Sequence, residues 1–158
     1  MTDHWRRAWG AGLLMLVAAC HSPPASPEEQ VRAVIATAER AAEEKDVQTL
    51  KRLVADGYGD DEGNRKADVI RLLAYHLLRN ESIHLLTRVR AVEFPSAERA
   101  AATVFVAMAG REIPDVALLA QLRADIYRFD IDLVAAGRGA WILTRARWRP
   151  AEIDDLAD

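Results

Sequence analysis

The sequence has little cysteine, few aromatic side chains and no excess of positive charge. A single cysteine in 158 residues excludes an internal disulfide and any zinc site built from several cysteines. With 21 Lys and Arg against 24 Asp and Glu, the net charge is −3, and no broad basic surface indicates nucleic-acid binding. An apolar run at residues 8–19 is too short to cross a bilayer. What remains is a chain that is 51% hydrophobic and has the length of one domain.

The N-terminus has the layout of a bacterial signal peptide. Arg6 and Arg7 precede the apolar run, and small residues lead into Cys20. The segment Leu16-Val17-Ala18-Ala19-Cys20 resembles the lipobox of bacterial lipoproteins, in which the cysteine thiol carries lipid and the chain is cut just before it, here between Ala19 and Cys20. The alternatives are a plain secretory signal with an unrelated cysteine, or a short buried helix.

The lipobox resemblance implies a lipid-anchored protein of the bacterial cell envelope that faces the periplasm. The predicted segments are a signal peptide at residues 1–19 and a lipidated tether at residues 20–26, which Pro23 and Pro24 favour as an extended chain. In enterobacterial lipoproteins an aspartate after the cysteine retains the protein in the inner membrane. His21 stands there, and it favours the outer membrane.

Three helices are expected after the tether. Ser26-Pro27-Glu28-Glu29 is a helix start, with a serine cap, proline at the first helical position and glutamate three residues after the cap. The apolar spacing that follows predicts a helix to about Lys45, and Asp46 can cap a second, shorter one. Residues 65–79 form the third, with His76 expected on its inner face. The acidic loop at residues 56–63 could bind calcium, but its spacing departs from the EF-hand pattern.

Four strands are expected after the helices, at residues 82–94, 99–109, 122–136 and 140–149. A turn at residues 95–98 joins the first two, residues 113–121 are a short helix or a loop, and residues 151–158 form an acidic tail that frays. The predicted fold is α+β, with three N-terminal helices packed on a curved, mainly antiparallel four-stranded sheet.

Alternation along the strands assigns two faces to this sheet. The inner, apolar face is predicted to carry Ile83, Leu85, Val89, Ala91, Tyr127, Phe129, Ile131, Leu133, Ile142, Thr144, Ala146 and Trp148. The outer face is predicted to carry arginines at positions 88, 90, 145, 147 and 149, with Asp130 and Asp132. These arginines could form a phosphate or nucleic-acid surface, but the aspartates favour a solvated face or a dimer interface.

The element order resembles the nuclear transport factor 2-like superfamily, a cone-shaped α+β fold. The resemblance covers about residues 27–150, and rests on the helix pair at residues 28–55, the long strand at residues 122–136 and the closing strand at residues 141–150. That last segment is similar to the "G-x-W-x-I…A-x-W" strand of many members. The superfamily includes ketosteroid isomerase-like and dehydratase enzymes, polyketide cyclase-like proteins and many binding or accessory domains, and homodimers through the outer face of the sheet are common in it.

Enzymes of this superfamily place a carboxylate, often with histidine or tyrosine, inside the cone. The matching candidates are Asp125, His76 and Tyr127, although Asp125 can equally form a rim ion pair with Arg123. A pocket is expected at Tyr127, Phe129, Thr144 and Trp148. The sequence predicts no metal site and no cofactor. It favours a non-catalytic binding or accessory module for a small apolar ligand or an envelope protein partner, with a small isomerase or dehydratase as the alternative.

Overall fold

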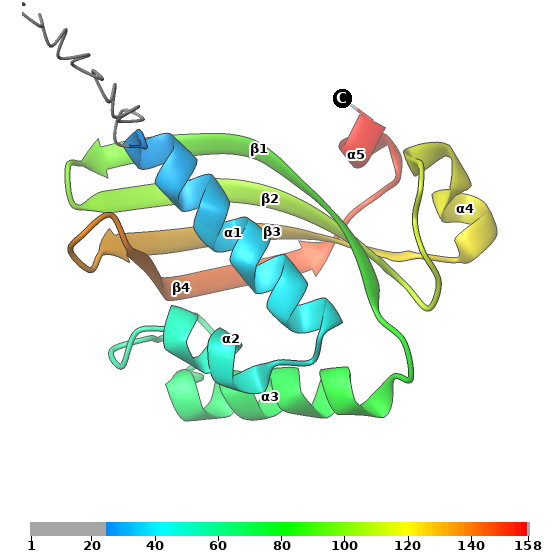
Figure 1. Cartoon of the computed structure of the whole chain (residues 1–158), viewed down its shortest axis with the longest axis horizontal. Helices are drawn as coiled ribbons and strands as arrows, with labels where there is room; N and C mark the ends of the chain where they lie inside the picture. Colours follow the sequence, from blue (N-terminus) through cyan, green and yellow to red (C-terminus); the bar gives the residue numbers. More distant parts are fainter. Residues whose placement is uncertain (1–24, 158) are drawn as a thin grey trace, which may run out of the picture.

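A computed structural model describes residues 25–157, which form helices packed on one curved sheet (Figure 1). The elements in chain order are α1 (Pro27–Glu43), α2 (Val47–Leu53), α3 (Lys66–Arg79), β1 (His84–Ser96), β2 (Arg99–Ala109), the 3-10 turn η1 (Val116–Leu118), α4 (Leu119–Leu122), β3 (Asp125–Ala135), β4 (Trp141–Pro150) and α5 (Asp154–Ala157). The strands are antiparallel in the order β1-β2-β3-β4. The predicted α+β class and element order are confirmed. In the described part of the chain, no helix is both long and apolar enough to cross a membrane.

Helix α1 begins at the predicted cap. The Ser26 hydroxyl accepts a hydrogen bond from the Glu29 backbone at 3.2 Å, and the Glu29 carboxylate accepts one from the Ser26 backbone at 2.6 Å. The bonds from Ser26 lower the pKa of Glu29. This reciprocal pair satisfies two of the amide groups that a helix start leaves free.

The inner face of the sheet packs against α1, which runs diagonally across it (Figure 1). Val31 and Ile35 of α1 are buried against Leu133 and Trp141 and against small residues of β2. The Trp141 indole donates a hydrogen bond to the Gln30 side chain at 3.2 Å. This cluster is the main core and holds α1 in place.

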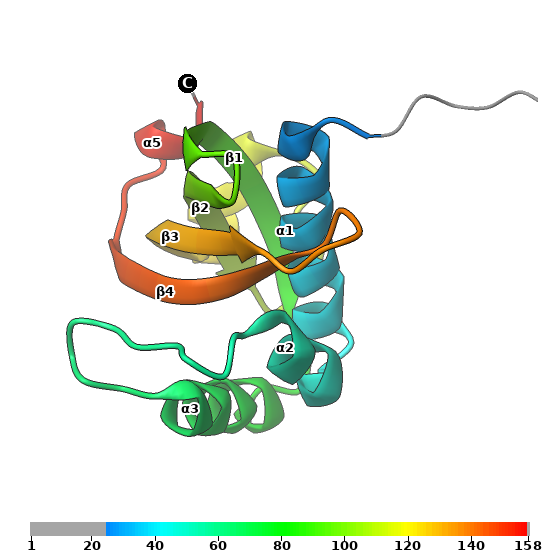
Figure 2. The ribbon, with the colours of Figure 1, turned by 90° about the vertical axis from the view of Figure 1, so that its left-hand side faces the viewer.

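The outer face is covered at one end by the β2–β3 connection and the C-terminal segment. A second cluster there combines Phe105, Ala107 and Ile126 of the sheet with Leu119 of α4 and Leu156 of α5. Figure 2 shows α1 and α5 on opposite sides of β1 and β2. The C-terminal segment was expected to fray. Instead Leu156 is fully buried, because it fits against this end of the sheet.

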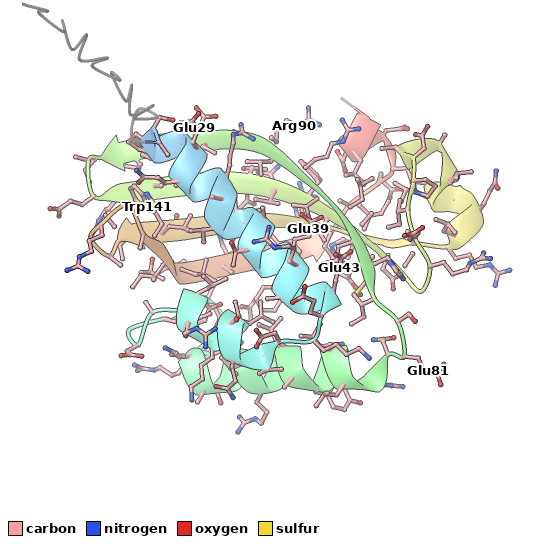
Figure 3. All side chains as sticks on the ribbon, viewed as in Figure 1. Glu29, Glu39, Glu43, Glu81, Arg90 and Trp141 are labelled. Atoms are coloured by element: carbon pink, nitrogen blue, oxygen red, sulfur yellow. The ribbon has the colours of Figure 1, made fainter. Side chains whose placement is uncertain are left out.

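The edge strand β1 is capped by polar side chains of α1. The Glu43 carboxylate accepts a hydrogen bond from the Leu85 backbone at 2.8 Å, and Arg32 donates to the Val89 carbonyl at 3.5 Å. Glu39 and Glu43 project from the α1 side that faces β1 (Figure 3). An edge strand with free amide groups invites pairing with other chains. These side chains occupy part of that edge.

Two β-bulges change the predicted faces. One falls between Val89 and Ala91, so Ala91 aligns with Thr103 on the outer face and Val92 takes the inner position. The other inserts Thr144 into β4, so Leu143 packs inward and Ile142 pairs with Val134, outside. The inward placements of Ala91 and Ile142 were therefore wrong, because each extra residue reverses the alternation beyond it.

Candidate functional site

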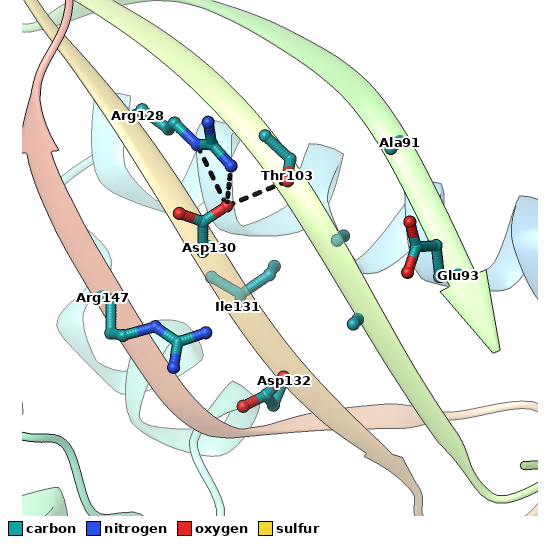
Figure 4. A pocket seen from close by; sticks show the side chains of 10 residues that line it. Ala91, Glu93, Thr103, Arg128, Asp130, Ile131, Asp132 and Arg147 are labelled. Atoms are coloured by element: carbon teal, nitrogen blue, oxygen red, sulfur yellow. Dashed lines mark hydrogen bonds and ion pairs between the residues drawn. The ribbon is translucent and has the colours of Figure 1, made fainter. Parts of the chain in front are cut away.

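The bare half of the outer sheet face contains an open hollow of about 380 Å³. We call it the outer trough. It spans all four strands (Figure 4). Its lining residues are Ala91, Glu93, Ala101, Ala102, Thr103, Arg128, Asp130, Ile131, Asp132 and Arg147.

The trough exists because β2 contributes only small side chains to it. Ala101 lies between Glu93 of β1 and Asp132 of β3, and Thr103 lies between the small Ala91 and Asp130. Where β2 next points outward it carries Phe105, and there the face is filled and covered. The alanine-rich start of β2 is thus the local cause of the hollow.

One wall of the trough is a fixed polar network. The Asp130 carboxylate accepts hydrogen bonds from Thr103 at 2.9 Å and from two nitrogens of Arg128 at 3.1 and 2.8 Å (Figure 4). Burial raises the pKa of Asp130, but these hydrogen bonds and the Arg128 charge outweigh it, so the pKa lies below its ordinary value. Asp130 is therefore ionised at neutral pH and suits charge pairing better than proton transfer.

Charges of both signs surround this network. Glu93 on β1 and Arg147 on β4 lie on opposite sides of the trough, and Arg128 and Asp132 of β3 lie on either side of Asp130 between them. Asp61, from the acidic loop before α3, reaches Arg145 at 3.1 Å and Arg147 at 4.0 Å. The loop that was considered for calcium therefore contributes an acid to the arginines of β4. Within residues 25–157, no cluster of three or more His, Cys, Asp or Glu could hold a metal ion.

A second hollow, of about 390 Å³, lies at the covered end of the same face. Arg88 and Ile153 line it together with Asp115 and small apolar residues of the η1–α4 segment. The Asp115 carboxylate is already used, since it accepts a hydrogen bond from the Ala117 backbone at 3.0 Å.

The predicted inner pocket is an aromatic surface of half-buried side chains. Tyr127, Phe129 and Trp148 face the helices, with ring centroids 6.4 Å apart for Tyr127–Phe129 and 6.5 Å for Phe129–Trp148. Thr144 stands at the β4 bulge and donates a hydrogen bond to the Asp132 carbonyl at 3.1 Å. Three of the four predicted residues therefore share one surface, and Thr144 is set aside by the bulge.

The structure does not bring the catalytic candidates into one hollow. His76 was expected on the inner face of α3, but its side chain is exposed and packs edge-on against the exposed Tyr75 ring. Asp125 is exposed at the start of β3. Neither residue lines the two hollows described above. The lipidation site Cys20 and its neighbour Ala19 lie outside the described residues.

The acids that face the inner side of the sheet, Glu39 and Glu43, belong to α1. Alternation along the strands could not predict them. Burial raises the pKa of Glu39; hydrogen bonds from Thr87 oppose this effect, and the nearby charge of Glu43 adds to it. Both carboxylates serve the β1 edge. The trough was also missed as a hollow. The signal that could have found it is the run Ala100-Ala101-Ala102 in β2, whose outward-facing member Ala101 is opposite Asp132 of β3.

Comparison with known proteins finds neighbours among solved structures only. No family model matches the chain, and neither does any curated protein sequence. A candidate scytalone dehydratase from Novosphingobium aromaticivorans aligns at 11% identity and a TM-score of 0.63, over 79% of this chain and 84% of that one. A candidate dehydratase of the nuclear transport factor 2-like family from Streptomyces avermitilis aligns at 17% and 0.61, over 80% and 97%.

Two further structural neighbours differ in how much of their own length this chain covers. A nuclear transport factor 2-like protein of unknown function from Shewanella oneidensis aligns at 11% identity and a TM-score of 0.57, over 78% of this chain and 98% of that one. A Bdellovibrio bacteriovorus protein aligns at 10% and 0.61, over 77% of this chain, which spans 40% of that protein's length. At these identities the likeness concerns the fold. The chain has a nuclear transport factor 2-like fold.

Proposed function

We propose that this protein is a lipid-anchored, non-catalytic binding module of the bacterial cell envelope, and that its outer trough pairs with a second copy of the chain. The observation that carries this proposal is the trough itself, an open hollow with the acidic Glu93 on one side and the cationic Arg147 on the other. An open surface with charges of both signs can be complementary to a protein partner, whereas small-molecule sites are mostly enclosed and apolar.

The charge layout of the trough is self-complementary. A two-fold axis along the strands, between β2 and β3, lays β4 of one copy over β1 of the other. It places Arg147 of one copy near Glu93 of the other, and repeats that pair on the far side of the axis. The η1–α4 segment and α5 cover only one end of the face and leave this region free. Opposite charges across an interface of this kind fix its register.

The anchor sets where the module works. Lipid on Cys20 would hold the domain at the outer membrane, facing the periplasm, by the tether of residues 20–26. Mass spectrometry of the protein from its native envelope should show an N-terminal cysteine with diacylglycerol. A chain that continues through Ala19 to an unmodified Cys20 would contradict the anchor.

An enzyme remains the second candidate, because two structural neighbours carry dehydratase names and Tyr127 lies on the inner face. That reaction would need Asp125 and His76 near Tyr127 around one substrate. Both of these side chains are exposed, and this favours binding over catalysis. A small apolar ligand on the aromatic inner surface is compatible with the binding role.

A charge swap tests the pairing. Sedimentation of the detergent-solubilised protein should give a dimer, and Glu93→Arg or Arg147→Glu should each weaken it at least tenfold through like-charge contacts. The double variant restores the opposite charges and should restore the dimer. Glu112→Arg, exposed in the loop after β2, is the matched control. A monomeric parent protein, or a double variant no better than the singles, would contradict the proposal.

A further inference from the structure

Helix α3 presents an apolar ridge to solvent. Leu72, Tyr75 and Leu78 are 39%, 56% and 70% exposed, and they are three of the four large hydrophobic side chains that are exposed in the described part of the chain. Their spacing of three residues places them along one ridge of the helix. The opposite side of α3 is buried through Val69 and Leu77. The ridge is therefore additional to the face that α3 needs for folding.

The ridge is centred on a tyrosine that its neighbours hold in place. Arg79 donates a hydrogen bond to the Tyr75 hydroxyl at 3.0 Å, and its guanidinium lies 5.8 Å from the ring centroid. The His76 ring packs edge-on against Tyr75 at 5.6 Å. Tyrosine and arginine dominate the binding energy of protein interfaces, and a side chain that is already ordered loses less entropy on binding.

The charge around the ridge is positive, although the whole chain is acidic. Residues 65–79 carry four cationic side chains and one carboxylate, Asp68. Arg71 forms an ion pair with Asp68 at 2.6 Å, and within residues 25–157 Arg79 has no carboxylate at ion-pair distance. An apolar ridge flanked by Arg71 and Arg79 is complementary to an apolar stripe flanked by acids.

A second copy of this chain is a poor partner for the ridge. If two α3 helices packed antiparallel about a two-fold axis at Tyr75, Arg71 of each copy would face Arg79 of the other, because both lie four residues from Tyr75. That arrangement creates two like-charge contacts. The charge pattern therefore disfavours self-pairing about Tyr75, in contrast to the outer trough.

The bilayer that holds the anchor is also a poor match. Helix α1 is about 25 Å long at 1.5 Å per residue, and α2 and α3 lie beyond its far end from the tether (Figures 1 and 2). Six residues from Cys20 to Ser26 reach at most about 20 Å when fully extended. This step rests on the proposed anchor, and it directs the ridge away from the membrane that the lipid enters.

We propose that the Leu72–Tyr75–Leu78 ridge of α3 docks an amphipathic helix of a second envelope protein, whose apolar stripe is flanked by acidic residues that pair with Arg71 and Arg79. When one helix docks on another, the contacts are made by apolar side chains at this spacing. The partner is thus defined by an acidic, amphipathic helix, and the site is separate from the trough.

Photo-crosslinking in intact cells tests the docking. With the photoreactive residue p-benzoylphenylalanine in place of Leu78, one discrete adduct should form with another protein. Its crosslinked peptide should carry acids beside apolar residues at helical spacing. Arg71→Glu together with Arg79→Glu should lower the adduct yield at least tenfold. The matched pair Arg111→Glu with Arg138→Glu, exposed in loops on other parts of the molecule, should leave it unchanged.

Four results would overturn this inference: no adduct, an adduct with phospholipid, an adduct with a second copy, or a yield indifferent to the charge reversals. Thermal unfolding of each variant checks that the exposed substitutions leave the fold intact. The trough charge swap is measured separately. An adduct that behaves as expected beside a monomeric protein would refute the proposed pairing alone, and a normal dimer without the adduct would refute the docking alone.

Discussion

The two faces of the sheet are formed by the same four strands, but they differ in how much of each is covered by other segments. The inner face is covered along β2 and β3 by α1, and its apolar residues form the main core. The outer face is covered only where Phe105 and Ile126 meet α4 and α5, and it stays open where β2 carries alanines. The covering segments and the size of the β2 side chains together therefore decide which half of the outer face is available to a partner.

The inner core should be the most sensitive region. Trp141 is 3% exposed, contacts the α1 cluster and donates to Gln30. Trp141→Ala should lower the free energy of unfolding by about 3–5 kcal/mol, since it removes a large buried side chain. Chemical denaturation measures the loss. A change below about 1 kcal/mol would mean that α1 is not held by this cluster.

The covered end of the outer face should come next. Leu156→Ala should cost about 2–4 kcal/mol, because it leaves a cavity beneath α5 beside Phe105 and Leu119. The neighbouring exposed Asp154→Ala is the control. Equal stability of the two variants would indicate that the C-terminal segment does not seal the sheet, and only the η1–α4 segment would then cover this end of the outer face.

The open half should be least important for stability. Asp130→Asn weakens the bonds from Arg128 and Thr103 and should cost about 1 kcal/mol. The folded-state pKa of Asp130 is lowered, so its stabilising effect is present above the unfolded pKa of 3.8 and is lost as pH falls through the folded value. The variant should therefore lose less stability than the parent protein on acidification below about pH 4.

Glu39 on the inner side should show the opposite pH dependence. Burial raises its folded pKa above 4.5, so its favourable contribution is present at low pH and is lost as pH rises through the folded value. Glu39→Gln keeps an acceptor for Thr87 without the charge. Its stability should equal or slightly exceed that of the parent protein at pH 7, with the difference shrinking toward pH 4. Denaturation at both pH values checks this, and a clear loss at pH 7 would contradict it.

Element order and helix starts could be predicted from the sequence because they depend on local chemistry. The Ser26 cap and the apolar spacing of α1 act over a few residues, and both are confirmed. The bulges were not predictable, since Arg90 and Thr144 resemble ordinary strand residues and only the pairing shows them to be extra. They explain the errors at Ala91 and Ile142.

The candidate site was harder to predict because it needs residues from separate elements. Alternation placed Asp130, Asp132 and Arg147 on the outer face correctly. The hollow between them depends on small residues of β2, and its limit depends on α5, neither of which a single strand reveals. Helix α3 carries leucines on several sides, and its periodicity did not show His76 to be exposed.

The most direct test of the pairing at the trough uses a cysteine on β2, next to the proposed two-fold axis. Ala101→Cys places a thiol on the floor of the trough, and the oxidising periplasm should link two copies through a disulfide in intact cells. Ala97→Cys, exposed in the β1–β2 turn, should remain monomeric under the same conditions. A dimer band on a non-reducing gel for Ala101→Cys alone is the predicted result. Equal bands for both variants, or none for Ala101→Cys, would contradict the account.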